Sequence, residues 1–157
     1  DANVSVDEAV ANIQNQFLNH MDATQQARII ELYKSQPYTI VDDPAGWKGG
    51  TFWEVNFQGD KILMQYNLQH NFFNELRGLE ERISAETDPE KLRELSQMIT
   101  ALVDLLLISF AKAEAGYDKD QTVKVEDMVE WLNGSWGQNL ASFVKAWVSS
   151  DHGKNNE

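Results

Sequence analysis

The sequence has no cysteine. This absence excludes disulfide bonds, thiolate metal sites and a cysteine nucleophile, but it leaves the cellular compartment open. Positive charge is also scarce, because 13 lysines and arginines stand against 25 aspartates and glutamates and give a net charge of −12. So acidic a chain is a poor match for nucleic-acid phosphates and for anionic membranes. A basic partner protein suits this charge, and so does the simpler explanation of a well-solvated surface.

The common signatures of catalysis are missing as well. The chain contains no Gly-x-Ser-x-Gly motif, no glycine-rich phosphate loop and no dinucleotide fingerprint, and its three histidines lack metal-ligand spacing. Asp118, Asp120 and Glu126 occupy ligand places of a loop like that of an EF-hand. Val123 and Val129, however, stand where that loop needs glycine and glutamate. We therefore expect neither a bound metal nor a cofactor.

No hydrophobic run is long enough to cross a bilayer, since charged residues flank the longest one. The chain begins with Asp1 instead of methionine, and residues 1–5 suit the mature end that remains after removal of a signal peptide. This pattern is compatible with an exported protein, periplasmic or secreted, but an artificially trimmed end explains it equally well, and a cytoplasmic location is the alternative.

The most apolar stretch of the chain lies between residues 88 and 117. Asp88 and Pro89 form a helix start, and Gly116 is a helix stop. Between them the apolar residues leave almost no polar stripe; they are Leu102, Val103, Leu105, Leu106, Leu107, Ile108 and Phe110. Because a helix that is apolar all round is normally buried on all sides, this stretch predicts the central helix of the fold.

Two helices are predicted before residue 37. Ser5 and Glu8 have the spacing of a capping box, and apolar residues then recur at helical spacing as far as Met21. The apolar stripe fails after that point, and Asp22 to Gln25 has the pattern of a second capping box. We therefore expect a break near residue 20 and a second helix that ends before Pro37.

The C-terminal half predicts further helices. Residues 68–83 are amphipathic with helical spacing and precede the central helix directly, so the two should be antiparallel neighbours. A short helix over residues 128–132 is expected to break at Asn133-Gly134, and a last amphipathic helix should span residues 140–148. Residues 149–157 form a polar tail.

Residues 52–68 predict a β-hairpin. Two strand-like runs flank a turn at residues 58–61, and this turn makes Phe57 face Ile62 and Val55 face Met64. Trp53 then faces Tyr66, so every pair on one face is apolar. Tyr38 and Ile40 alternate with a polar residue and suggest a third strand. The predicted fold is α+β: one domain over residues 1–157, mostly helical, whose antiparallel three-stranded meander packs its apolar face on the helices around a buried central helix.

Tryptophan offers the remaining functional signal. Trp53, Trp131 and Trp147 lie on apolar faces and are expected in the core. Trp47 and Trp136 lie among small or polar residues, and Lys48 adds a positive charge beside the first of them. Aromatic side chains on loops often anchor partners, so these three residues are the candidate contacts for a ligand or partner. The alternative is that both tryptophans cover the edge of the core.

Three functions are compatible with this sequence. The first is a non-catalytic protein that binds a partner protein, as an adaptor, inhibitor or immunity-type protein. The second is a small-ligand binder whose pocket, lined by Trp47, Trp53 or Tyr66, lies between the meander and the helices. The third is an enzyme with a site of dispersed carboxylates and His70. An exposed apolar patch would favour the first, an enclosed cavity the second, and convergent polar groups with shifted pKa values the third.

Overall fold

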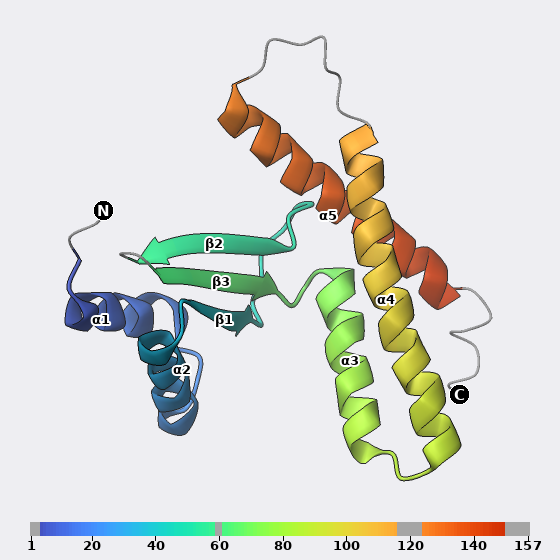
Figure 1. The fold of residues 1–157 in the computed structure, drawn as a ribbon, viewed down its shortest axis with the longest axis horizontal. Helices are drawn as coiled ribbons and strands as arrows, with labels where there is room; N and C mark the ends of the chain where they lie inside the picture. Colours follow the sequence, from blue (N-terminus) through green and yellow to red (C-terminus); the bar gives the residue numbers. More distant parts are fainter. Residues whose placement is uncertain (1–3, 59–60, 116–123, 150–157) are drawn as a thin grey trace. The chain divides into compact units, whose positions relative to one another are not determined.

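The computed structural model describes residues 4–58, 61–115 and 124–149. It contains helices and a small sheet, so the fold is α+β and mostly helical, as predicted (Figure 1). The elements in order are α1 (Val6–Phe17), α2 (Ala23–Ser35), β1 (Tyr38–Asp43), β2 (Trp53–Gln58), β3 (Lys61–Asn67), α3 (Asn71–Ala85), α4 (Pro89–Ala115) and α5 (Val125–Ser149).

These elements form two compact units. Unit 1 consists of residues 1–45 and 53–67 and holds α1, α2 and the sheet. Unit 2 consists of residues 46–52 and 68–157 and holds α3, α4 and α5. The single-domain organisation expected from the sequence stays a prediction.

The two N-terminal helices start where their caps predict. The Ser5 side chain accepts a hydrogen bond from the backbone N–H of Glu8 at 3.2 Å and begins α1. The Asp22 side chain accepts from the N–H of Gln25 at 2.8 Å, and the Gln25 side chain accepts from the N–H of Asp22 at 3.4 Å. This reciprocal pair is a complete capping box, and it confirms the predicted break between α1 and α2.

The sheet has the strand order β1-β3-β2. β2 and β3 are antiparallel, and the predicted hairpin pairs Trp53–Tyr66, Val55–Met64 and Phe57–Ile62 are all confirmed. The predicted antiparallel meander is wrong, because β1 pairs with β3 in the parallel direction and makes the sheet mixed. A period of two identifies a strand, but it carries no information on which neighbour the strand chooses.

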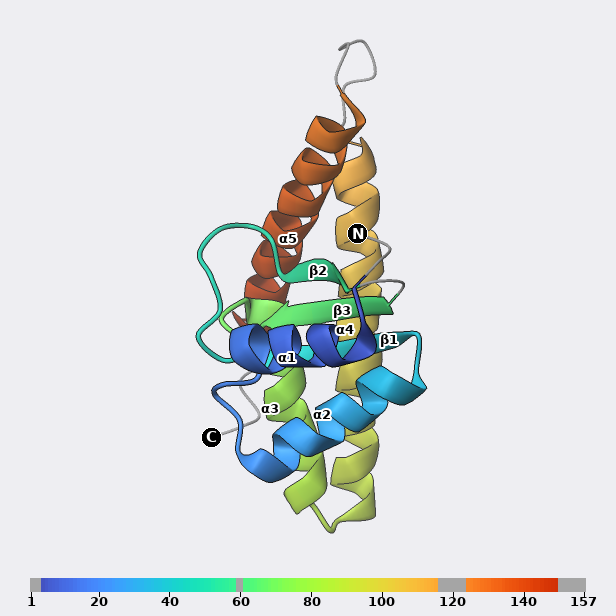
Figure 2. The same ribbon diagram turned by 90° about the vertical axis from the view of Figure 1, so that its left-hand side faces the viewer.

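The two faces of the sheet differ in what covers them. The inner face presents Val41 and Leu63, which are 1% and 0% exposed, to α1 and α2. Figure 2 shows α1 in front of the strands. The buried cluster that joins helices and sheet consists of Ala9, Ile13, Leu18, Tyr33, Val41 and Leu63. The paired apolar residues of the hairpin lie on the other face, so the prediction that they pack on the helices is wrong within unit 1.

Lys61 ties the start of β3 to the end of α2. Its Nζ donates to the carbonyls of Tyr33 and Lys34, at 2.5 and 2.8 Å, and lies 5.2 Å from the centre of the Tyr33 ring. Carbonyls in the last turn of a helix have no partner within the helix and carry partial negative charge, so an ammonium group stabilises them. This contact holds the sheet against α2.

In unit 2 the α4 helix is partly exposed instead of buried on all sides. Its buried residues form one stripe: Leu95, Leu102, Ser109 and Ala113. Helices α3 and α5 both pack on α4 and on each other. Val103, Leu107 and Ile108 are 47%, 63% and 58% exposed. The predicted central burial is wrong because two neighbouring helices cover only part of the circumference of α4.

The α5 helix is continuous, so the predicted break at Asn133-Gly134 is wrong. A Cβ built on Gly137 would lie 1.4 Å from the carbonyl oxygen of Gly50, and one built on Gly50 would lie 2.5 Å from the carbonyl oxygen of Gly134. These glycines therefore let the backbone of residues 46–52 lie directly on the helix.

Phe52, at the end of that segment, is the aromatic hub of unit 2. It is 3% exposed, and its ring centre lies 5.0 Å from that of Trp136 and 5.2 Å from that of His70. The rings of Phe72 and Phe73 complete the group at 6.2 and 5.9 Å. These separations fall in the range of favourable edge-to-face and tilted contacts, so the cluster joins α3, α5 and residues 46–52.

We predict that Gly137→Ala lowers the free energy of unfolding by more than about 3 kcal/mol, because the added methyl group collides with the backbone of Gly50. The matched control is Gly134→Ala in the same helix, where a Cβ meets nothing within 4 Å. The control should leave stability unchanged or raise it by up to about 1 kcal/mol. Urea denaturation measures both, and equal effects would contradict the close approach.

A second pair of variants tests the exposure of α4. Leu102→Ala should cost about 2–5 kcal/mol of unfolding free energy, because Leu102 is 1% exposed and its truncation leaves a cavity. Leu107→Ala should change it by less than about 1 kcal/mol, since Leu107 is 63% exposed. Chemical denaturation of both variants is the measurement. Similar losses would restore the view of α4 as a helix buried on all sides.

Candidate protein-binding surface

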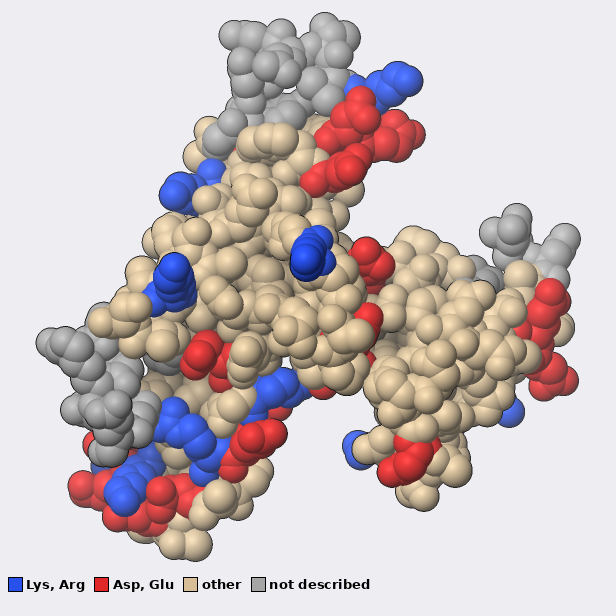
Figure 3. Space-filling view, turned by 180° about the vertical axis from the view of Figure 1, so that it is seen from behind, with Lys and Arg blue, Asp and Glu red and all other residues tan. Residues whose placement is uncertain are grey.

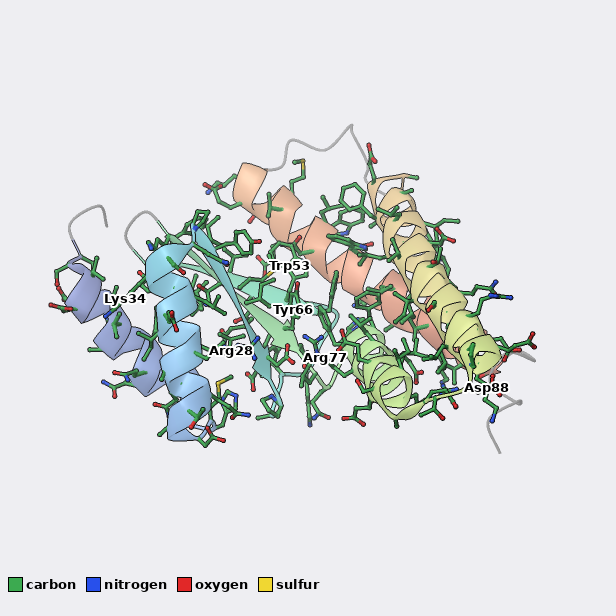
Figure 4. All side chains as sticks on the ribbon, turned by 60° about the horizontal axis from the view of Figure 1, so that its bottom comes forward. Arg28, Lys34, Trp53, Tyr66, Arg77 and Asp88 are labelled. Carbon is green, nitrogen blue, oxygen red and sulfur yellow. The ribbon has the colours of Figure 1, made fainter. Side chains whose placement is uncertain are left out.

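The outer face of the sheet is the surface that the strands present away from Val41 and Leu63. Strand pairing places its residues in three rows: Tyr38–Ile62–Phe57, Ile40–Met64–Val55 and Asp42–Tyr66–Trp53. Residues directly opposite each other on paired strands share a face, so each row is a continuous line of side chains across the sheet. Figure 4 shows Trp53 and Tyr66 on neighbouring strands.

The first row is the most exposed. Phe57 is 71% exposed, Tyr38 55% and Ile62 36%, while Ile40 in the second row is 39% exposed. Several large apolar side chains that adjoin in this way differ from the single exposed residues found on any protein, and they are typical of an interaction site. The alternation in the sequence predicts that most of this face is apolar, but the face was expected in the core, because alternation does not reveal which face the helices cover.

The outer face is nearly free of charge. Asp42 is the one charged residue in its three rows. Glu54 and Lys61 alternate with the outer-face residues of their strands and so lie on the inner side. Charged side chains of both signs gather instead over the hairpin of α3 and α4 (Figure 3). The outer face therefore suits an apolar contact better than a network of ion pairs.

The predicted contact residues Trp47 and Lys48 lie in unit 2. The Trp47 side chain is half-buried, and its Nε1 donates to the Thr51 hydroxyl at 2.9 Å. Lys48 is exposed. Gly46 and Gly49 on either side have φ of 55° and 115°, so this segment needs the conformational freedom of glycine. A binding role for Trp47 and Lys48 stays a prediction.

The other predicted contact, Trp136, is inside α5 and not in a loop. Its Nε1 donates to the Leu106 carbonyl at 2.9 Å, and its ring lies 5.0 Å from both Phe52 and Phe110. These contacts hold α5 to α4. The sequence was interpreted as a loop at this point, so it could not predict these contacts of a helical residue.

Both ring nitrogens of His70 make hydrogen bonds within the fold. Its Nδ1 accepts a hydrogen bond from the N–H of Phe72 at 3.1 Å and so caps α3. Its Nε2 lies 2.7 Å from the Gly137 carbonyl oxygen. A carbonyl only accepts, so Nε2 carries the proton and the ring is the neutral tautomer. Both ring nitrogens are thus engaged between α3 and α5, which leaves neither available as a general base.

Burial is the main cause that lowers the pKa of His70 from its ordinary value of 6.5, while the hydrogen bond to the Gly137 carbonyl raises it. The ring is 6% exposed and lies against Phe52, so it has little access to water. The neutral form is therefore the one that the fold stabilises.

The structure gives little support to the predicted metal ligands and to the predicted pocket. Asp118 and Asp120 lie outside the described residues, and Glu126 is exposed in the first turn of α5. In the described ranges no cluster of three or more potential ligands could hold a metal ion. An open hollow in unit 1 is bordered by residues other than the predicted Trp53 and Tyr66, namely Gln14, Ala23, Gln26, Ala27, Ile30, Glu31, Lys34 and Ser35.

Comparison of the chain with protein-family models, with curated proteins and with solved structures finds no match. Among the described residues, none of the helices has the length and apolar character needed to span a membrane.

The burial of His70, which lowers its pKa, predicts a pH-dependent contribution to stability. Because its folded pKa is below 6.5, the unfolded chain binds a proton before the native state does as the pH falls. The contribution of His70 is therefore fully present above about pH 6.5, decreases as the pH falls below that value, and levels off below the folded pKa.

The matched variant is His70→Asn, which keeps an acceptor for the N–H of Phe72 but loses the bond to Gly137 and cannot titrate. We expect it to cost about 1–3 kcal/mol at pH 8. The difference in unfolding free energy between parent and variant should shrink between pH 8 and pH 5. A difference that stays constant, or grows on acidification, would show that His70 is not held neutral.

Proposed function

We propose that the chain is a non-catalytic binding protein that engages a partner protein through the outer face of its sheet. The observation that carries this proposal is the adjoining row of Tyr38, Ile62 and Phe57, which are 55%, 36% and 71% exposed. Aromatic side chains at the centre of an interface supply much of its binding energy. Covering Phe57 alone would contribute about 1.5–3 kcal/mol from removal of its apolar surface from water.

The proposed partner presents a complementary apolar surface. The first two rows of the outer face contain no charged residue, so they offer little that would favour a highly charged contact. The net charge of −12 acts at longer range and would speed the approach of a basic partner. In this proposal the apolar rows supply affinity and the acidic remainder of the chain influences the rate of encounter.

The test begins by placing a photo-crosslinking phenylalanine analogue at position 57 and isolating the attached protein from an extract of the native host. The affinity of the purified partner is then measured for Phe57→Asp and for Leu107→Asp. Both variants replace an exposed apolar side chain, 71% and 63% exposed respectively, by the same charge. Only the first lies on the outer face.

We expect Phe57→Asp to lower the affinity for the partner by at least about 30-fold, the equivalent of about 2 kcal/mol. Leu107→Asp should leave this affinity within about 2-fold of that of the parent. Both variants should retain the thermal unfolding transition of the parent, because each replaced side chain is largely exposed. Loss of binding in Leu107→Asp with normal binding in Phe57→Asp would contradict the proposal and move the site to α4.

A further inference from the structure

The β2 strand lies at an edge of the sheet, and Glu54 is the one charged residue in it. Its register with β3 is unbroken from the Trp53–Tyr66 pair to the Gln58–Lys61 pair, so no bulge interrupts it. Residues 53–58 contain no proline, glycine or lysine. Natural edge strands generally carry such features, because an unprotected edge is a template for another strand.

The opposite edge of the same sheet is protected. β1 ends in Asp42 and Asp43, and Pro44 follows directly. Pro37 stands immediately before the strand. Charge and proline at a strand end discourage pairing with a further strand. The β1 edge is therefore better protected than the β2 edge, which favours pairing along β2.

The sequence of β2 is compatible with an antiparallel copy of itself. Opposed residues in such a pair must point to the same face, and the two registers that allow this with the longest overlap centre on Val55 and on Asn56. With Val55 opposite itself, Trp53 faces Phe57. Glu54, the one charged residue of β2, then faces the amide of Asn56.

The second register has the same property. With Asn56 opposite its own copy, Val55 faces Phe57 on the outer side. The position opposite Glu54 is then 58, where the sequence has glutamine and no charge. Like charges are opposed in neither register, and apolar residues meet apolar residues on the outer face in both.

We propose that two copies of this chain pair along β2 and join their three-stranded sheets into one. This inference concerns the sheet edge and does not rest on the proposed function of the outer face. Joining the edges would add backbone hydrogen bonds between the two β2 strands and would make the two outer faces continuous. The dimer would thereby present two partner sites on one surface, with the gain in avidity that bivalent binding gives.

The charge of the chain opposes this association, because each copy carries a net charge of −12. At physiological ionic strength, salt screens the repulsion between charges that are more than about 8 Å apart. Backbone hydrogen bonds and apolar contacts are affected far less. The dimer should therefore become tighter as sodium chloride is added. Association through ion pairs would show the opposite dependence.

The absence of cysteine makes the geometry directly testable, since an introduced cysteine is the only thiol of the chain. Val55→Cys and Asn56→Cys each place that thiol opposite its own copy in one register. Directly opposed strand residues have Cβ atoms about 4.5–5.5 Å apart, close to the span of a disulfide. Ile40→Cys, on β1 and on the same outer face, is the matched control.

We expect the parent to show a concentration-dependent mass that rises towards twice 17.9 kDa in light scattering, more so at high salt. Under mild oxidation Val55→Cys or Asn56→Cys should form a covalent dimer at least about 10-fold faster than Ile40→Cys. A parent that stays at 17.9 kDa at every concentration and salt level would overturn the proposal. Equal crosslinking of Ile40→Cys would also overturn it, because it would indicate face-to-face packing.

A charge variant keeps the proposal testable if a cysteine variant folds poorly. Asn56→Glu opposes like charges in both registers, against Glu54 in one and against its own copy in the other. It should weaken the dimer at least about 10-fold, whereas Ser84→Glu, an equal charge change at an exposed position of α3, should not. Equal weakening by both variants would show a general charge effect and contradict pairing along β2. Neither result depends on whether the outer face binds a partner.

Discussion

A three-stranded sheet has two faces, and the two helices of unit 1 cover one of them. This constraint decides what the surface can do. Helices α1 and α2 close over Val41 and Leu63, and Lys61 fixes the sheet to the end of α2. The side chains that alternate with these residues must point the other way. Because they include Tyr38 and Phe57, the covered face forms a small core and the other face forms an apolar surface.

Unit 2 depends on a different constraint, the close approach of two backbones. Gly50 lies on α5 at Gly137, where a Cβ has no room, and Phe52 then enters an aromatic cluster. His70 caps α3 and bonds to the carbonyl of the same Gly137. One turn of α5 thus holds both residues 46–52 and α3 in place. A residue so engaged stabilises the fold, which explains why His70 in this structure does not resemble a catalytic base.

Local features were predictable from the sequence, and their partners were not. The hairpin pair Val55–Met64 and the capping box of Asp22 depend on neighbouring residues, so their signals lie within short segments. Strand order and the covered face depend on distant residues, and alternation is the same whichever face is covered. Asn133-Gly134 was predicted to break the last helix, but α5 runs through it, because a glycine inside a helix costs only about 1 kcal/mol. Likewise, the sequence showed that Phe57 belongs to an apolar face but not that the face is exposed.

The outer face of the sheet is open to solvent, whereas the inner face is not. Hydroxyl-radical footprinting of the full chain, normalised to the unfolded protein, measures this difference for individual side chains. We expect rapid modification of Phe57 and Tyr38 and strong protection of Leu63 and Val41. Protection of Phe57 equal to that of Leu63 would contradict it, because the outer face would then be covered in the isolated chain.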